Sequence, residues 1–222
     1  MIIQTPSYVV RSLNSNDVYW EQDVYPDWTP LRTFRPFPNQ KRGHGVEPHY
    51  HDGDELWLFT SGRGEVWLND RVFPITPNTA VYTPMGTVHR FQMFTDFDNV
   101  AMVTPLERQK RPIHVTVEEH GPPLPTVPGF VVPGERNLGP FADRGSRCPL
   151  SELRMVELGP GEGVEDAASP ANEHWAVIAG SVGLGLGGVE VELFPGDVGL
   201  LRAGTRRRLY SEAGARLALA RE

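Results

Sequence analysis

The two halves of this 222-residue chain align with each other at one constant offset and without a gap. Counterparts lie 118 positions apart, as Glu55 and Glu173 do, and the same offset relates Trp57 to Trp175 and Gly62 to Gly180. Further pairs at this offset are Gly45-Val46-Glu47 with Gly163-Val164-Glu165, Pro77 with Pro195, and Gly86-Thr87 with Gly204-Thr205. Turn glycines and aromatic residues that keep one offset indicate a duplicated folding unit, with each half forming its own core.

Each half consists of short apolar runs that alternate with turn signals. The run at 55–59 precedes a glycine-containing turn at 61–64, and the next run, 65–68, ends at the pair Asn69-Asp70. Asn and Asp tolerate positive φ, so this pair predicts a hairpin turn. With 23 Gly and 21 Pro and no sustained helical periodicity, the chain is expected to be all-β, with two tandem barrels.

A segment rich in proline and glycine separates the two halves. Because a proline within a strand removes a ladder hydrogen bond, we expect a connector here, with at most a short edge strand at 129–132. The predicted organisation is a first barrel at 1–112, a connector at 113–148 and a second barrel at 149–222.

Charge and composition exclude several classes of partner. The formal net charge is -7, which argues against a nucleic-acid partner. The chain has no apolar run near the ~18 residues of a membrane helix, and its start does not resemble a signal peptide. Cys148 is the only cysteine, so a reducing cytoplasm is the expected location. A small-molecule substrate is the expected partner, and a homodimer is possible.

Four side chains in the first half have the types and spacing of a metal site. His49 and His51 share one face of a strand because side chains alternate with period two. Glu55 follows a short turn, and His89 follows the rigid turn Pro84-Met85-Gly86. Three imidazoles and one carboxylate suit one divalent transition metal (Fe, Mn, Ni, Co or Zn) and leave two coordination positions open.

At these residues the sequence resembles the cupin superfamily. Its first motif is matched by Gly43, five residues, His49-x-His51, three residues, Glu55, six residues and Gly62. Its second motif is matched by Pro84-x-Gly86, two residues and His89, with Asn78 replacing the leading glycine and Met93 the closing asparagine. The resemblance implies two tandem double-stranded β-helix (jelly-roll) barrels with a metal inside. It does not imply one reaction, because the superfamily includes dioxygenases, decarboxylases, isomerases, lyases and non-enzymatic binders.

The second half lacks this ligand set. At the 118-residue offset, His49 becomes Ala167, His51 becomes Ser169 and His89 becomes Arg207, while Glu173 remains. We therefore expect one metal site per chain, and we predict that Glu173 and Arg207 form a salt bridge inside the second barrel. An anion site at Arg207 with Arg206 or Arg208 is the alternative to a solvated arginine run.

Strand alternation also predicts the surroundings of the metal. Trp57 and Phe59 share the inward face of Glu55, and Thr87, Phe91 and Met93 share that of His89. These five residues are the expected substrate pocket, unless they only fill the barrel interior. Leu56 and Leu58 face outward and are apolar, which predicts that a second barrel or subunit covers them.

The remaining histidines and one glutamate are expected to lie outside the ligand set. His44 has no partner at motif spacing, so solvent exposure is expected, and His114, His120 and His174 are also interpreted as non-ligands. Glu47 is repeated as Glu165, which favours a structural role.

Three functions are compatible with these residues. The first is a metal-dependent enzyme on a small organic substrate, with dioxygenase-type chemistry favoured and Glu55 serving as ligand and base. The second is a sugar isomerase or epimerase, because Glu173-His174-Trp175 with Gly180 resembles the barrel of some mannose-phosphate isomerases. The third is a non-catalytic small-molecule binder.

Overall fold

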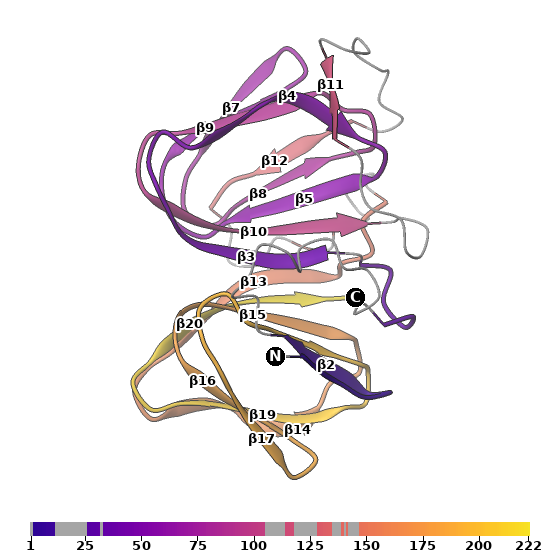
Figure 1. The fold of residues 1–222 in the computed structure, drawn as a ribbon, viewed down its shortest axis with the longest axis vertical. Coiled ribbons are helices and arrows are strands. Elements are labelled where there is room, and N and C mark those ends of the chain that lie inside the picture. Colours follow the sequence, from indigo (N-terminus) through magenta and orange to yellow (C-terminus); the bar gives the residue numbers. More distant parts are fainter. Residues whose placement is uncertain are drawn as a thin grey trace.

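A computed structural model describes residues 2–11, 26–31, 33–104, 114–117, 128–134, 139, 141 and 147–222. It shows two β-barrels stacked one on the other (Figure 1), and the expected all-β fold is confirmed. His120 and most of the expected connector lie outside the described residues. No helix among the described residues is long and apolar enough to cross a membrane.

The first barrel consists of two five-stranded sheets, each with its own strand order. One sheet has the order β12 (Phe130–Val132), β8 (Thr79–Thr83), β5 (Asp54–Phe59), β10 (Phe97–Thr104) and β3 (Thr33–Gln40). The other has the order β11 (His114–Thr116), β4 (Gly45–His51), β9 (His89–Met93), β6 (Gly64–Leu68) and β7 (Arg71–Ile75). Every pairing between these strands is antiparallel.

The second barrel repeats this arrangement at the 118-residue offset. Its larger sheet has the order β1 (Ile2–Gln4), β2 (Tyr8–Arg11), β18 (Val198–Leu201), β15 (Glu173–Gly180), β20 (Ala215–Arg221) and β13 (Glu152–Leu158). Its smaller sheet has the order β14 (Glu162–Ala168), β19 (Arg206–Ser211), β16 (Val182–Leu186) and β17 (Val189–Leu193). The hairpins β6–β7 and β16–β17 have identical lengths and registers at this offset, which supports a duplicated unit.

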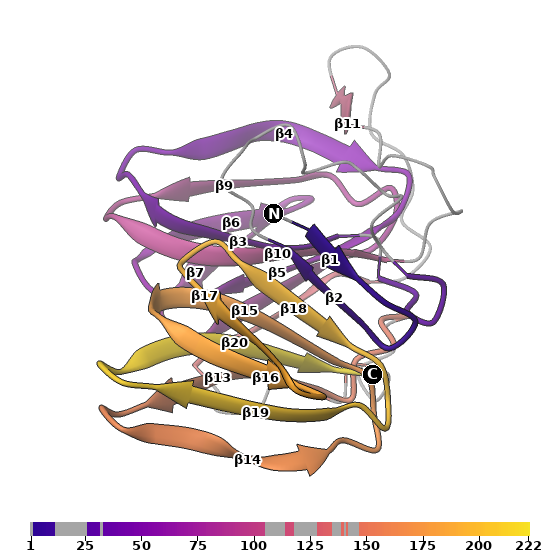
Figure 2. The same ribbon diagram turned by 60° about the horizontal axis from the view of Figure 1, so that its bottom comes forward.

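Each barrel is completed on one side by a strand from outside its own half of the sequence. β2 pairs with β18 of the second barrel, although the expected boundary of 1–112 assigns Ile2–Arg11 to the first (Figure 2). Conversely, β12 from the expected connector pairs with β8 of the first barrel. The two exchanged strands occupy equivalent positions, since β8 and β18 are counterparts, and β1 extends the sheet beyond β2.

The turn residues adopt the conformations that the sequence predicts. Asn69 has a φ of 51° in the hairpin between β6 and β7, and Asn78 has a φ of 63°. Such left-handed backbone is tolerated by Asn better than by most residues with a side chain.

A large apolar core lies between the two barrels. Leu56 and Leu58 of β5 are buried there with Ile178 of β15 and Leu200 of β18. This confirms the prediction that the outer face of β5 is covered, and the second barrel provides the cover. Each barrel also has its own interior core, centred on Trp57 and Phe59 in the first and on Trp175 in the second.

Candidate metal centre

Three histidines from two neighbouring strands converge inside the first barrel. His49 and His51 lie on β4, His89 lies on β9, and His49 pairs with His89 across the sheet. All three are buried, and one ring nitrogen of each lies within 4.8 Å of the others. His49 Nε2 and His51 Nε2 are 3.2 Å apart.

Glu55 reaches the same point from the opposite sheet. Its Oε2 lies 3.2 Å from His89 Nε2 and 3.4 Å from His51 Nε2. Glu55 Oε2 and His89 Nε2 are both buried and have no hydrogen-bond partner among the described residues. Ligand atoms ~2.1 Å from one metal ion and at right angles lie ~3 Å apart, so these separations fit a shared cation.

Backbone carbonyls fix which nitrogen of the His49 and His89 rings points inward. His49 Nδ1 donates to the carbonyl of Glu47 at 2.7 Å, and His89 Nδ1 donates to the carbonyl of Thr87 at 2.8 Å. A proton held on Nδ1 leaves the Nε2 lone pair free to bind a metal.

The protonation states of His49 and Glu55 also suit metal binding. Burial, with His89 close by, lowers the pKa of His49 to about 3, so its ring is neutral at neutral pH. Burial would raise the pKa of Glu55, but His51 and His89 outweigh it and hold this pKa well below its usual range. Neutral imidazoles and an ionised carboxylate are the forms that bind cations. The residues present therefore fit a divalent transition metal.

A buried carboxylate that the sequence did not single out supports this geometry. Asp54 accepts hydrogen bonds from the Tyr82 hydroxyl (2.9 Å), the Met85 backbone N–H (2.8 Å) and Arg147 Nε (3.1 Å). It therefore joins the start of β5, which carries Glu55, to the turn that precedes His89. Spacing could not reveal this link, because Arg147 is 93 residues away.

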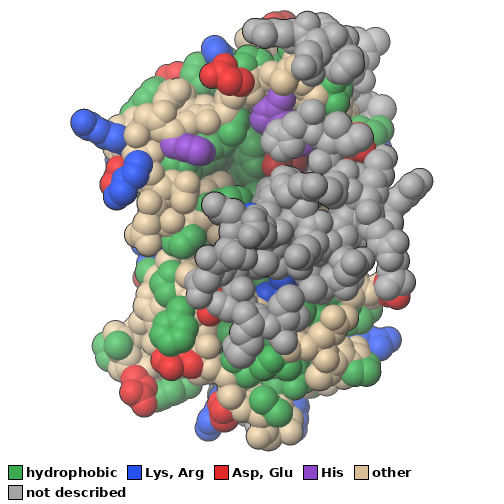
Figure 3. All heavy atoms as spheres, viewed as in Figure 1, with side chains coloured by type: hydrophobic (Ala, Val, Ile, Leu, Met, Phe, Trp, Pro, Cys, Tyr) green, Lys and Arg blue, Asp and Glu red, His purple; other side chains and the backbone are tan. Residues whose placement is uncertain are grey.

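A cavity of about 200 Å³ opens from the candidate ligands along the barrel interior. His49 and Glu55 line one end of it, and Trp57, Phe91 and Ala101 form its walls. Phe37, Gln40, His44, Val46, Phe97 and Asn99 line the remainder. Figure 3 shows histidine side chains at the rim of a hollow with hydrophobic side chains inside, on the face of the first barrel.

The expected pocket residues divide between this wall and the core behind it. Trp57 and Phe91 line the cavity, whereas Phe59, Met93 and Thr87 are buried but do not line it. Phe59 and Met93 belong to the interior core, and Thr87 provides the carbonyl that orients His89. The remaining wall comes largely from β3 and β10, and only the alternation of Phe97, Asn99 and Ala101 signalled it in the sequence.

His44 is exposed, as expected, but it also lines the mouth of the cavity. Its ring centroid lies 6.0 Å from that of Phe91 and 5.9 Å from that of Phe97. Among the described lining residues outside the candidate ligands, His44 is the titratable one. The other histidines differ: the backbone of His114 pairs with that of His51, and His174 Nε2 lies 3.0 Å from Glu222 Oε1.

The second barrel contains a salt bridge where the first has its histidines, as predicted. Arg207 Nε donates to Glu173 Oε2 at 2.9 Å, and Arg207 Nη2 donates to Glu173 Oε1 at 3.1 Å. Arg221 Nε and Trp175 Nε1 also donate to Glu173, at 3.0 and 2.9 Å. Glu173 is fully buried, and these donors lower the pKa of its carboxyl group against the opposing effect of burial. The Arg207 guanidinium thus neutralises the carboxylate of Glu173, the counterpart of the candidate ligand Glu55.

The arginines beside Arg207 face away from the barrel interior. Arg206 and Arg208 are exposed, and Arg208 Nη2 lies 3.0 Å from Glu190 Oε1 on the neighbouring strand. This arrangement supports the solvated arginine run rather than an interior anion site.

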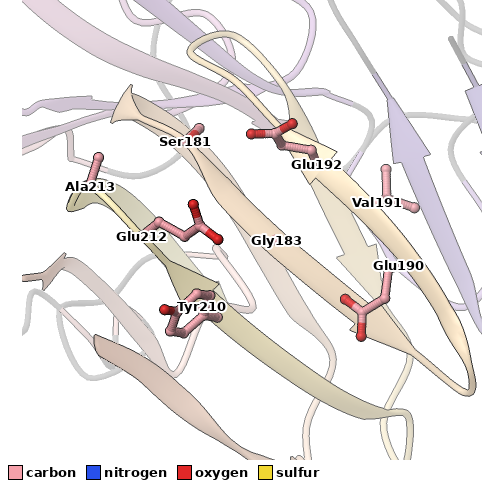
Figure 4. Close-up of a pocket in the computed structure, with 8 residues that line it drawn as sticks. All are labelled: Ser181, Gly183, Glu190, Val191, Glu192, Tyr210, Glu212 and Ala213. Carbon is pink, nitrogen blue, oxygen red and sulfur yellow. The ribbon is translucent and has the colours of Figure 1, made fainter. Parts of the chain in front are cut away.

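A hollow on the outer face of the second barrel has a simple origin in the duplication. Glu190, Glu192, Tyr210 and Glu212 surround Gly183 there (Figure 4). The counterparts of Gly183 and Gly185 are Glu65 and Trp67, and Arg90 lies over the Trp67 ring at 4.2 Å. Glycines thus leave empty a surface that large side chains cover in the first barrel.

Comparisons with known proteins agree with this geometry. Residues 40–104, which contain all four candidate ligands, match the cupin domain family. The first barrel is a cupin domain. An uncharacterized protein of Sinorhizobium fredii, y4oW, is 32% identical over 85 residues, which are 38% of this chain and 39% of the relative.

Solved structures extend the likeness to the whole chain. One is a variant of oxalate decarboxylase from Bacillus subtilis, with a TM-score of 0.65 and 13% identity. The alignment spans 100% of this chain and 75% of the decarboxylase chain. Another is AerE from Microcystis aeruginosa, with a TM-score of 0.57 and 11% identity. The alignment spans 100% of this chain and 96% of the AerE chain. A further structure of the Bacillus subtilis decarboxylase was determined in a study of its Mn(II) centres (TM-score 0.59, 12% identity). At these identities the likeness establishes the two-barrel cupin fold and leaves the reaction open.

Proposed function

We propose that this cupin is a metal-dependent enzyme that acts on a small, uncharged organic substrate, with dioxygenase-type chemistry. The observation that carries the proposal is the cavity, which begins at His49 and Glu55 and continues between Trp57 and Phe91. Its volume of about 200 Å³ is below the usual range of ligand pockets, ~300–1,000 Å³, so only a small molecule fits.

The lining explains why the substrate should be uncharged. Among the described residues, no Lys or Arg side chain lines the cavity, so an anionic group away from the metal would lack a counter-ion there. An oxalate-type reaction is therefore less favoured here than in the decarboxylases that share the fold.

Each side chain at the site would have a distinct task. His49, His51, His89 and Glu55 would hold the metal, and iron bound there would supply redox chemistry with dioxygen. Trp57 and Phe91 would orient a planar substrate and exclude water. Glu55, held ionised by its histidine neighbours, would accept a proton from a substrate hydroxyl at Oε2.

His44 is the observation that favours a second candidate, an isomerase or lyase on a sugar or related carbonyl compound. A titratable ring at the cavity mouth could move a proton on the substrate, which oxygen chemistry at the metal would not need. The two candidates differ in whether His44 and dioxygen are required.

Metal content and oxygen uptake test the proposal together. Protein purified without added metal should contain iron, which elemental analysis would detect, and should consume oxygen with phenolic or diketone compounds. His49→Ala should lose the metal, whereas His44→Gln should keep both metal and oxygen uptake. Bound zinc or manganese with activity that His44→Gln abolishes would favour the isomerase. Metal binding without turnover of either substrate class would favour a non-catalytic binder.

A further inference from the structure

Asn99 is a buried amide in the otherwise mostly apolar wall of the cavity. Only 6% of it is exposed, and it lines the cavity with Trp57 and Ala101. Its side chain forms no hydrogen bond with any described residue, although its strand neighbour Asp98 has several. The Asn99 amide therefore keeps its hydrogen-bonding capacity unused at the cavity surface, where a bound molecule can reach it.

The second barrel shows that the fold does not require this amide. At the 118-residue offset, the counterpart of Asn99 is Leu217, which is fully buried in the core of the second barrel. The same strand position therefore accepts leucine where no metal site exists. Asn99 accompanies the histidines in the first barrel and is replaced with them in the second, which associates it with the ligand that the cavity receives.

The register of β10 places Asn99 at the end of the cavity away from the metal. Glu55 pairs with Val103, Trp57 pairs with Ala101, and Phe59 pairs with Asn99. Asn99 is thus four residues along β10 from the position opposite Glu55, which corresponds to ~13 Å of strand. A molecule that touches both ends must lie along Trp57, and the small side chain of Ala101 leaves room for it.

Two other polar groups line the same end, but neither is equivalent to Asn99. The Gln40 amide donates to the Pro38 carbonyl at 3.2 Å. His44 is exposed and lies against Phe91 and Phe97. Asn99 is the buried lining group whose donor and acceptor are both unused among the described residues.

We infer that Asn99 is a specificity-determining residue that hydrogen-bonds the far end of the substrate. The inference rests on the proposed function and names its substrate class, a small, planar, uncharged molecule with two polar ends. One end carries an oxygen that binds the metal, and the other carries a neutral carbonyl or hydroxyl group. The Asn99 amide can donate a hydrogen bond to such a carbonyl group or accept one from such a hydroxyl group.

A binding cycle with two matched ligands tests this inference without turnover. The protein is loaded with zinc, which is not redox-active, and titrated with 3,4-dihydroxyacetophenone or 4-ethylcatechol by calorimetry. Both ligands have vicinal hydroxyl groups that can bind the metal, and they differ in having or lacking a distal carbonyl. The acetyl group also acidifies the hydroxyl groups, which affects zinc binding equally in both proteins, so the preference for the ketone should be about three- to tenfold larger in wild type than in Asn99→Leu.

Controls separate the hydrogen bond from changes in the metal site. Asn99→Leu should still bind one zinc ion per chain, and Gln92→Leu, an amide-to-leucine change outside the cavity, should keep the preference for the ketone. A preference for the ketone that is equally large in wild type and in Asn99→Leu would overturn the role of Asn99 while leaving the pocket intact. Failure of the zinc-loaded wild type to bind either catechol would instead refute the proposed substrate pocket, and this inference with it.

Discussion

Replacing Glu173 by Gln tests the view that a salt bridge stabilises the second barrel where the first has a metal site. The carboxylate accepts from Arg207, Arg221 and Trp175, and it is fully buried. Glutamine has nearly the same shape but removes the charge. Because the Arg207 side chain is only 6% exposed, its guanidinium would remain buried after losing the negative charge of Glu173.

The expected loss in the free energy of unfolding is about 3–5 kcal/mol, which is typical when one partner of a buried ion pair is removed. For a chain of this size each kcal/mol lowers Tm by ~2–4 °C, so Tm should fall by ~6–20 °C. Urea unfolding followed by tryptophan fluorescence measures the change, and Trp175 is in direct contact with the altered group. Glu190→Gln is the matched control, because its pair with Arg208 is exposed and should contribute under about 1 kcal/mol.

The double variant Glu173→Gln with Arg207→Met extends the test. Since the buried positive charge of Arg207 is then also removed, the double variant should be more stable than Glu173→Gln alone. Two results would contradict a stabilising Glu173–Arg207 pair. One is a loss of less than about 1 kcal/mol in the free energy of unfolding of Glu173→Gln, and the other is simple additivity of the effects of the two substitutions.

Three further predictions concern acid stability, the interface and the cysteine. The pKa of Glu173 and that of Glu222 are lowered in the folded protein, so both stabilise it at neutral pH. This stabilisation should be lost as the pH falls below the usual pKa range of carboxyl groups towards the lowered pKa values of the folded protein. The decrease of Tm with falling pH should therefore be smaller in Glu173→Gln than in wild type. Leu200→Ala, between the barrels, should cost about 2–5 kcal/mol in urea unfolding, whereas the exposed Val189→Ala should cost little; similar costs would contradict the shared core. Burial raises the pKa of the Cys148 thiol to about 12, so a disulfide reagent at pH ~8 should label it only after denaturation, and rapid labelling of the native protein would argue against its burial.

The sequence was sufficient for features that depend on local spacing. Strand alternation placed His49 and His51 on one face, and the turn before His89 adopts the conformation that Gly86 permits, with a φ of 81°. The constant offset showed that the second barrel has Arg207 in place of a histidine, and the salt bridge with Glu173 followed from charge. The apolar outer face of Leu56 and Leu58 likewise predicted the cover that the second barrel provides.

Other features depend on which distant strands become neighbours, and these only the tertiary structure decided. Alternation gives the face of a residue but not its partner, so it could not show that β2 completes the second barrel or that β12 completes the first. For the same reason, the sequence could not show that Arg147 forms a hydrogen bond with Asp54, 93 residues away. The cavity wall combines β3, β4, β5, β9 and β10, and its volume depends on packing between two sheets. The sequence by itself therefore determined the candidate metal ligands and the barrel that carries them, while the three-dimensional packing decided the size of the cavity and the place of Asn99 within it.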